Sequence, residues 1–245
     1  MHARDAVHVL RSALASQDAT GRALTRDTRR HALWTDCWDA LDDGGEGRRD
    51  RPVVALLAGR FRPPHAGHVT LALRLLQCCD AVVIAVDPSG DAGRGDRSGA
   101  ITPDLAAACW AEQLSWAGVG SDAGLAPWSG ASAPPRAIIC TDTARAAETL
   151  LFQEAERTGL RAVRVAGQEA QLLEPPDCSA HRRLPLLVLP RESGGISSSD
   201  VRARPLGGEA LPRPAEVARV AALLFPAGAQ RQRAALAERI CDALW

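Results

Sequence analysis

Three residue types are missing from this chain of 245 residues: lysine, tyrosine and asparagine do not occur, and all 29 basic residues are arginine. Their codons are AT-rich, so a GC-rich genome explains their absence, and the arginine count by itself carries no functional meaning. The absence still has a chemical consequence. Any phosphate contact that lysine could make must here come from arginine, whose planar guanidinium can donate to two phosphate oxygens at once.

The chain also lacks an excess of charge, long apolar runs and paired cysteine motifs. Its 29 acidic residues balance the 29 basic ones, so no overall field attracts a polyanion such as tRNA or DNA. No stretch approaches the ~18 apolar residues of a membrane span, and the polar start is unlike a signal peptide. The seven cysteines show no C-x-x-C spacing, which fits a reducing cytosol. We expect a cytoplasmic protein that binds neither nucleic acid nor membrane.

The first part of the chain has a helical pattern. Residues 4 to 41 carry apolar side chains at helical spacing, which predicts two helices, and a polar, glycine-rich stretch follows up to position 50. We interpret residues 1–50 as a helical N-terminal extension and linker outside the sheet. A role in packing or dimerisation fits it better than a catalytic one, which leaves a homo-oligomer open.

From position 53 onward, apolar runs of strand length alternate with helical segments. The predicted strands are 53–58, 81–86, 137–141, 162–166 and 184–189, and the predicted helices are 66–78, 103–117 and 143–158. This alternation predicts an α/β fold with a Rossmann-like parallel sheet and right-handed crossovers.

We assign residues 51–204 to this sheet domain and residues 205–245 to a C-terminal helical segment. Its helices, 214–224 and 228–244, are expected on the edge of the sheet. The glycine-rich loops 87–99 and 118–135 are candidates for a substrate lid, although solvated connectors are commoner.

A phosphate-binding turn is predicted directly after the first strand. From Gly59 to His68 the sequence reads G-R-F-R-P-P-H-A-G-H and continues into a helix. A strand that feeds a glycine turn and then a helix presents backbone N–H groups to phosphate. Pro63 and Pro64 fix an extended approach to His65, and Gly67 admits a ligand close to the backbone.

Two histidines stand in this turn. His65 and His68 are three residues apart, so both imidazoles lie on one face of the first helical turn. Each can donate an N–H to an oxyanion. A zinc site at this pair is disfavoured, because no cysteine or carboxylate accompanies it at ligand spacing. We therefore expect no metal site built from these side chains.

A second polar segment, residues 195 to 202, reads G-I-S-S-S-D-V-R. Its serines are expected at the start of a short helix, where hydroxyls cap the helix and exposed N–H groups attract anions. By itself a serine cluster is a plain cap. Together with the first segment, the serine cluster is better interpreted as part of a phosphate-binding site.

Together the two segments resemble the G-x-F-x-P-x-H-x-G-H and I-S-S-T-x-x-R motifs of the nucleotidylyltransferase (cytidylyltransferase-like) superfamily, in the same order. Arg60 makes the first segment most similar to archaeal-type nicotinamide mononucleotide adenylyltransferases. The chain departs from the pattern at Ser199, where threonine is usual, and at Arg62, where glutamine is common. The resemblance implies transfer of a nucleoside monophosphate from a triphosphate to a phosphorylated small-molecule acceptor, with Mg²⁺ and release of pyrophosphate.

The resemblance also implies roles for individual residues. His65, His68 and Arg202 would be catalytic, with His68 nearest the α-phosphate. The nucleotide-binding residues would be Gly59, Arg60, Phe61, Gly67, Ile196, Ser197, Ser198 and Ser199. Arg60 and Arg62 are candidates for the acceptor phosphate, although a surface charge explains Arg62 equally well.

The sequence leaves the roles of several side chains and the identity of the nucleotide undecided. Asp87 and Asp142 follow strands and can face the site, but a turn and a helix cap explain them as well. Trp110, Trp116 and Trp128 can stack on a base, although buried packing is the default for the first two. ATP is the expected nucleotide, and a CTP-dependent cytidylyltransferase acting on a small phosphate or phosphonate is the alternative. A non-catalytic nucleotide-binding regulator is the alternative of another class.

Overall fold

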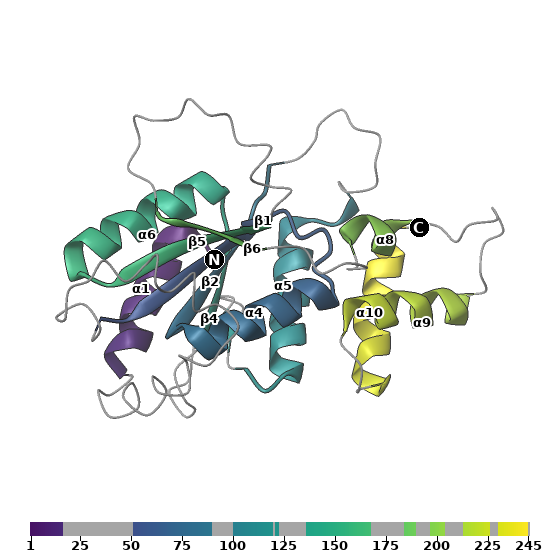
Figure 1. The fold of residues 1–245 in the computed structure, drawn as a ribbon. Helices are drawn as coiled ribbons and strands as arrows, with labels where there is room; N and C mark the ends of the chain where they lie inside the picture. The colour runs from purple at the N-terminus through teal and green to yellow at the C-terminus, as the bar shows by residue number, and fades with distance from the viewer. Residues whose placement is uncertain are drawn as a thin grey trace.

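The fold is taken from a computed structural model of all 245 residues. The structure describes residues 1–16, 51–89, 100–119, 121–122, 136–167, 184–189, 197–203, 213–225 and 230–244. Within these ranges one parallel sheet lies between layers of helices (Figure 1). This confirms the Rossmann-like α/β fold, with helices at both ends of the chain, that the sequence predicts. No described helix is long and apolar enough to cross a membrane.

The sheet has six described strands, all parallel, in the order β3-β4-β2-β1-β5-β6. Their bounds are Val53–Gly59 (β1), Ala81–Val86 (β2), Ser121–Asp122 (β3), Ala137–Thr141 (β4), Arg161–Gly167 (β5) and Leu186–Leu189 (β6). The chain runs outward from β1 to β2 and β4, then returns to β5 on the other side of β1. Ligands of such sheets bind beyond the carboxyl ends of the strands where the order reverses, which is here the end of β1.

Helices cover both faces of the sheet, so its strands are apolar on both sides. α4 (Ala66–Cys78) and α5 (Pro103–Trp116) pack on one face, and α6 (Ala144–Thr158) packs on the other. Right-handed crossovers require this, because the chain reverses direction across the sheet after β4. Neighbouring residues of β1 accordingly point to opposite faces: Leu57 belongs to the α5 side of the core and Leu56 to the α6 side.

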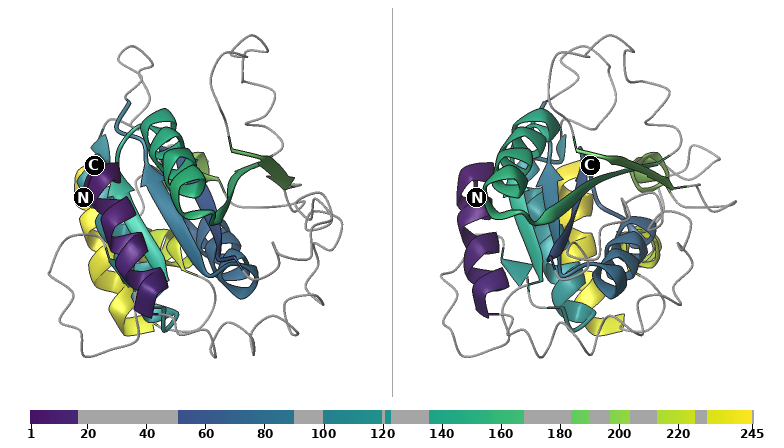
Figure 2. Two further views of the ribbon diagram at one scale, coloured as in Figure 1. Left: turned by 90° about the vertical axis from the view of Figure 1, so that its left-hand side faces the viewer. Right: turned by 60° about the vertical axis from the view of Figure 1, so that its left-hand side comes forward.

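The sequence predicts that residues 1 to 41 lie outside the sheet. The first helix, α1 (Ala3–Ser16), instead packs on the sheet. Its apolar stripe, which includes Leu10 and Leu14, packs beside α6 over Val83 and Ile138 (Figure 2). Without α1, those side chains of β2 and β4 would lack a cover on this face. Residues 17–50, with the second predicted helix and the linker, lie outside the described residues. The predicted boundaries of the sheet domain stay a prediction.

The C-terminal helices are α8 (Ser198–Arg202), α9 (Arg213–Leu224) and α10 (Gln230–Leu244). We expected the last two on the sheet's edge, but they pack on the outer side of α5. The rings of Trp116 and Phe225 lie 6.2 Å apart, and Nε2 of Gln113 donates to the carbonyl oxygen of Leu224 at 2.7 Å. α5 is apolar on both its sides, and such a helix must be buried between two partners.

Candidate functional site

The turn after β1 is strained and tightly packed at Phe61. Its φ of 46° is unusual for a bulky residue. The Phe61 ring folds back over Gly59, where an added Cβ would lie 3.0 Å from the ring's Cζ atom. A side chain at position 59 would therefore require the Phe61 ring to shift by a few tenths of an ångström. Backbone strain of this kind costs free energy and concentrates at functional sites.

The two histidines of the turn stack on each other at the start of α4. His65 is the N-cap residue, with the extended backbone that the two prolines predict (φ −127°, ψ 172°). Its backbone N–H donates to Nδ1 of His68 at 3.3 Å, and the ring centroids are 3.7 Å apart. Because Nδ1 accepts this bond, neutral His68 carries its proton on Nε2. His68 is thereby prepared as a donor, and its side chain is partly exposed.

Buried aromatic rings fix the orientation of His68. Phe61 meets His68 edge-on at 4.9 Å and meets Trp110 of α5 edge-on at 5.3 Å. Trp110 is fully buried, which agrees with its interpretation as a packing residue. Gln113, on the same helix, donates to the carbonyl oxygen of Pro64 at 3.3 Å. The turn is thus anchored to α5 at two points.

The second motif meets the first at this turn. Ser198 donates its hydroxyl to the carbonyl oxygen of Pro63 at 2.9 Å, although the two residues are 135 positions apart. Arg202 donates from Nη1 to the carbonyl oxygen of Arg62 at 2.5 Å. Nη2 of Arg202 also reaches the hydroxyl of Ser199 at 3.3 Å. The structure therefore brings Ser198 and Arg202 of the second motif against the turn of the first.

Ser197 begins α8 as predicted. Its hydroxyl accepts the backbone N–H of Asp200 at 3.1 Å, and the Asp200 carboxylate accepts the backbone N–H of Ser197 at 2.6 Å. This reciprocal pair is a capping box. Gly67 lies exposed in the first turn of α4. Ile196 lies outside the described residues, as does Trp128.

Sequence reasoning missed the residue that holds α8 in place. Arg219 of α9 donates to the carbonyl oxygens of Asp200, Val201 and Ala203 at 3.0 to 3.2 Å. Glu216, which is buried, orients Arg219 through a 2.8 Å ion pair. The only sequence signal is an acid and a base three residues apart on a helix, which is typical of a surface ion pair.

The ends of β2 and β4 carry the two aspartates. Asp87 accepts backbone N–H groups from Ser89 (2.8 Å) and Ala144 (3.3 Å). Partial burial alone would raise the pKa of Asp87, but these bonds and the charge of Arg60 outweigh it and hold that pKa below its ordinary value. Asp142 accepts the backbone N–H groups of Ala3 and Thr143, so its role is to cap.

The two arginines of the turn differ in exposure. Arg60 is exposed. Arg62 is only 5% exposed, and its Nη2 reaches the carbonyl oxygen of Asp87 at 3.1 Å. A solvated surface charge is therefore the wrong interpretation of Arg62.

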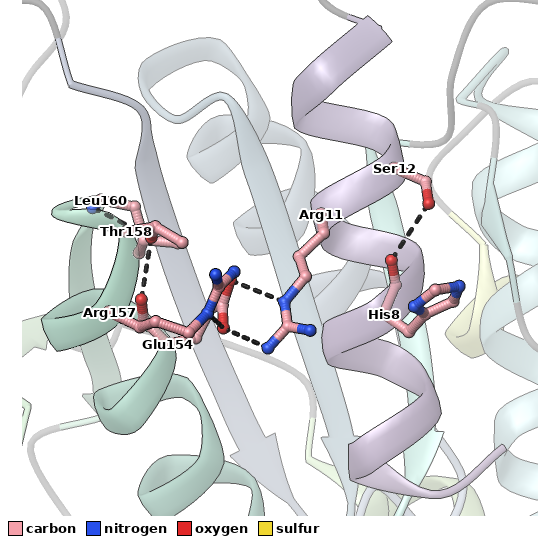
Figure 3. A network of polar contacts seen from close by, with 7 residues as sticks. All are labelled: His8, Arg11, Ser12, Glu154, Arg157, Thr158 and Leu160. Atoms are coloured by element: carbon pink, nitrogen blue, oxygen red, sulfur yellow. Dashed lines mark hydrogen bonds and ion pairs between the residues drawn. The ribbon is translucent and has the colours of Figure 1, made fainter.

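A cavity of about 270 Å³ lies elsewhere, at the opposite ends of the strands. It is lined by Pro52, which precedes β1, and by the C-terminal turns of α1 and α6. Arg11 and Arg157 flank Glu154 at its wall (Figure 3). None of the motif residues lines this cavity, so we do not assign the chemistry to it.

Two buried cysteines of the described residues are unreactive. Burial raises the pKa of the Cys109 and Cys140 thiols to about 12, so they stay protonated and are poor nucleophiles. Among the residues that the structure describes, no group of three or more His, Cys, Asp or Glu side chains could hold a metal ion. The site instead offers N–H, hydroxyl and guanidinium donors, which suit a polyanion.

Comparison with known proteins adds no relative to this picture: no protein-family model matches the chain, and no curated protein does.

Proposed function

We propose that this protein is a nucleotidylyltransferase, which moves a nucleoside monophosphate from a nucleoside triphosphate to a phosphorylated small-molecule acceptor. The observation that supports this most is the contact between the two motifs, in which Ser198 and Arg202 donate to the carbonyl oxygens of Pro63 and Arg62. Hydrogen-bond donors from distant parts of the chain thus flank one turn, at the end of the sheet where ligands of such folds bind.

The reaction needs alignment and charge stabilisation more than acid–base chemistry. The acceptor phosphate is already ionised at neutral pH, so one of its oxygens can attack the α-phosphorus directly. The bond from that phosphorus to the β-phosphate oxygen breaks, and its electron pair leaves with pyrophosphate. His68 offers its Nε2–H to the developing charge at the α-phosphate. Arg202 and Ser199 offer donors to the leaving phosphates.

Mg²⁺ belongs to the substrate in this proposal. Mg²⁺ is commonly held by one or two carboxylates and the phosphates of a nucleotide, and it keeps several waters. The described side chains form no cage for it. We therefore treat the metal as entering with the triphosphate, whose charge it partly neutralises.

The nucleotide favoured by the motif resemblance is ATP, with nicotinamide mononucleotide as acceptor. The described donors all suit phosphates and do not distinguish adenine from cytosine. CTP with a small phosphate or phosphonate acceptor therefore stays the alternative. A non-catalytic nucleotide-binding regulator is less well supported, because His68 and Arg202 are both present at the same turn.

The test is a screen of ATP, CTP, GTP and UTP against phosphorylated acceptors that include nicotinamide mononucleotide, with pyrophosphate release as the readout. We expect one pair to give turnover that needs both substrates. Arg202→Ala should remove it, whereas Arg239→Ala, on α10 and paired with Glu112, should not. Nucleotide binding without turnover for any pair would favour the regulator.

A further inference from the structure

Among the residues that the structure describes, no counter-ion accompanies the buried side chain of Arg62. The residue is 5% exposed, and its Nε is buried with no hydrogen-bond partner among the described residues. Its one described side-chain hydrogen bond runs from Nη2 to the neutral carbonyl oxygen of Asp87. No carboxylate of the described residues forms an ion pair with Arg62.

The carboxylate of Asp87, whose backbone carbonyl Arg62 contacts, is bound to other groups. The carboxylate of Asp87 accepts the backbone N–H groups of Ser89 and Ala144, at the start of α6. It therefore stabilises backbone donors and does not form an ion pair with the Arg62 guanidinium. Burying an unpaired charge is costly, and proteins normally satisfy such a group with an opposite charge. Arg62 thus has the properties of an anion-binding side chain.

The geometry also separates this guanidinium from the second motif. Arg202, on α8, contacts the backbone carbonyl of Arg62. The side chain of Arg62 runs to the carbonyl of Asp87, which follows β2. α8 thus contacts the backbone of Arg62, whereas Asp87 contacts its guanidinium.

We infer that Arg62 binds the phosphate of the acceptor, beside the end of β2 and apart from the triphosphate bound near His68 and Arg202. This inference rests on the proposed function. Nε–H has no described partner, and Nη2 carries a second N–H besides the one bound to Asp87, so the guanidinium keeps donors for phosphate oxygens.

Binding of two simple anions tests the inference without knowledge of the base. Tripolyphosphate is the probe for the triphosphate subsite, and inorganic phosphate, titrated into protein saturated with tripolyphosphate, is the probe for the second subsite. By calorimetry, we expect Arg62→Met to weaken phosphate binding about tenfold or more, as the loss of a charged hydrogen bond does. Its affinity for tripolyphosphate should stay within about twofold of wild type. Arg202→Met should show the reverse pattern.

Equal phosphate affinity in wild type and Arg62→Met overturns the inference, as does a loss of tripolyphosphate binding in that variant. If wild type binds phosphate but not tripolyphosphate, the anion site at Arg62 is supported and the proposed function is contradicted. If wild type binds neither anion, the inference and the proposed function are both contradicted.

Stability and turnover complete the test. Without ligand, Arg62→Met should melt no lower than wild type, because it removes an unpaired buried charge; phosphate should raise the melting temperature of wild type only. If Arg62→Met does not fold, Arg62→Lys decides: a several-fold loss of phosphate affinity supports the inference and an unchanged affinity overturns it. With the acceptor found in the screen, Arg62→Met should raise the acceptor KM about tenfold and leave the nucleotide KM unchanged. An unchanged acceptor KM would assign the site to free phosphate and contradict the acceptor role.

Discussion

At the scale of single residues, the site depends on how one histidine is held. His68 accepts a hydrogen bond on Nδ1 from the backbone of His65, and its ring meets the edge of Phe61. The first contact sets the tautomer and the second sets the direction of the ring. Together they aim Nε2–H without any side chain acting as a base.

We predict that His68→Ala lowers the rate of transfer about 10²–10³-fold, which is typical for the loss of one preorganised donor. The fold should survive, because the ring is partly exposed on the turn. His8→Ala, at an exposed position of α1, is the matched control and should keep wild-type activity. Pyrophosphate release measures both, and a His68→Ala enzyme near wild type would contradict the assignment.

At the scale of elements, one helix supports another. α8 is a single turn of five residues, too short to be stable alone. Arg219 of α9 binds two carbonyl oxygens of α8 and that of Ala203, which follows it, and Arg219 is itself held by buried Glu216. We therefore regard Arg219 as a positioning residue for Arg202.

Arg219→Ala should weaken nucleotide binding about tenfold, because α8 would lose three hydrogen bonds that hold it against the turn. Arg219→Lys should restore part of the affinity, since one ammonium cannot reach all three carbonyls. Calorimetry below the melting temperature of each variant measures this, with Arg239→Ala as the control. Equal nucleotide affinity in all four proteins would contradict a positioning role for Arg219.

At the scale of the whole molecule, α1 is part of the core. It covers β2 and β4 next to α6, and Arg11 joins it to Glu154, whose side chain is 2% exposed. Bonds from Arg11 and Arg157, against some cost of burial, lower the pKa of Glu154 from its ordinary 4.5 to about 2. The link between α1 and α6 therefore persists in moderately acidic solution.

Glu154→Gln should lower the free energy of unfolding at pH 7 by about 2 kcal/mol, the scale of hydrogen bonds to a charged group. Because the folded pKa is depressed, this contribution is complete above pH 4.5 and is lost as the pH falls toward 2. Denaturant melts across that range should show the two proteins converging, whereas exposed Glu238→Gln should match wild type throughout. A difference that does not change with pH would contradict the ion-pair explanation.

The sequence predicts the sheet well and its surroundings less well. Apolar runs such as 81–86 are short, rich in valine and bounded by polar residues, which favours a buried strand. The spacing of His65 and His68 after a glycine turn predicts their common face. The apolar stripe in the sequence of α1 predicts that this helix face is buried, but it does not predict which surface covers it. The burial of Arg62 likewise depends on the end of β2, which no local pattern reveals.

The central claim is that two distant motifs form one site for one nucleotide. Calorimetric titration of the Mg²⁺ complex of the nucleotide found in the screen, with wild type, His68→Ala, Arg202→Ala and the double variant, tests it most directly. We predict that each single change weakens binding of the same nucleotide and that the double variant departs from additivity, as residues sharing one ligand do. Wild-type affinity in both single variants would contradict the claim.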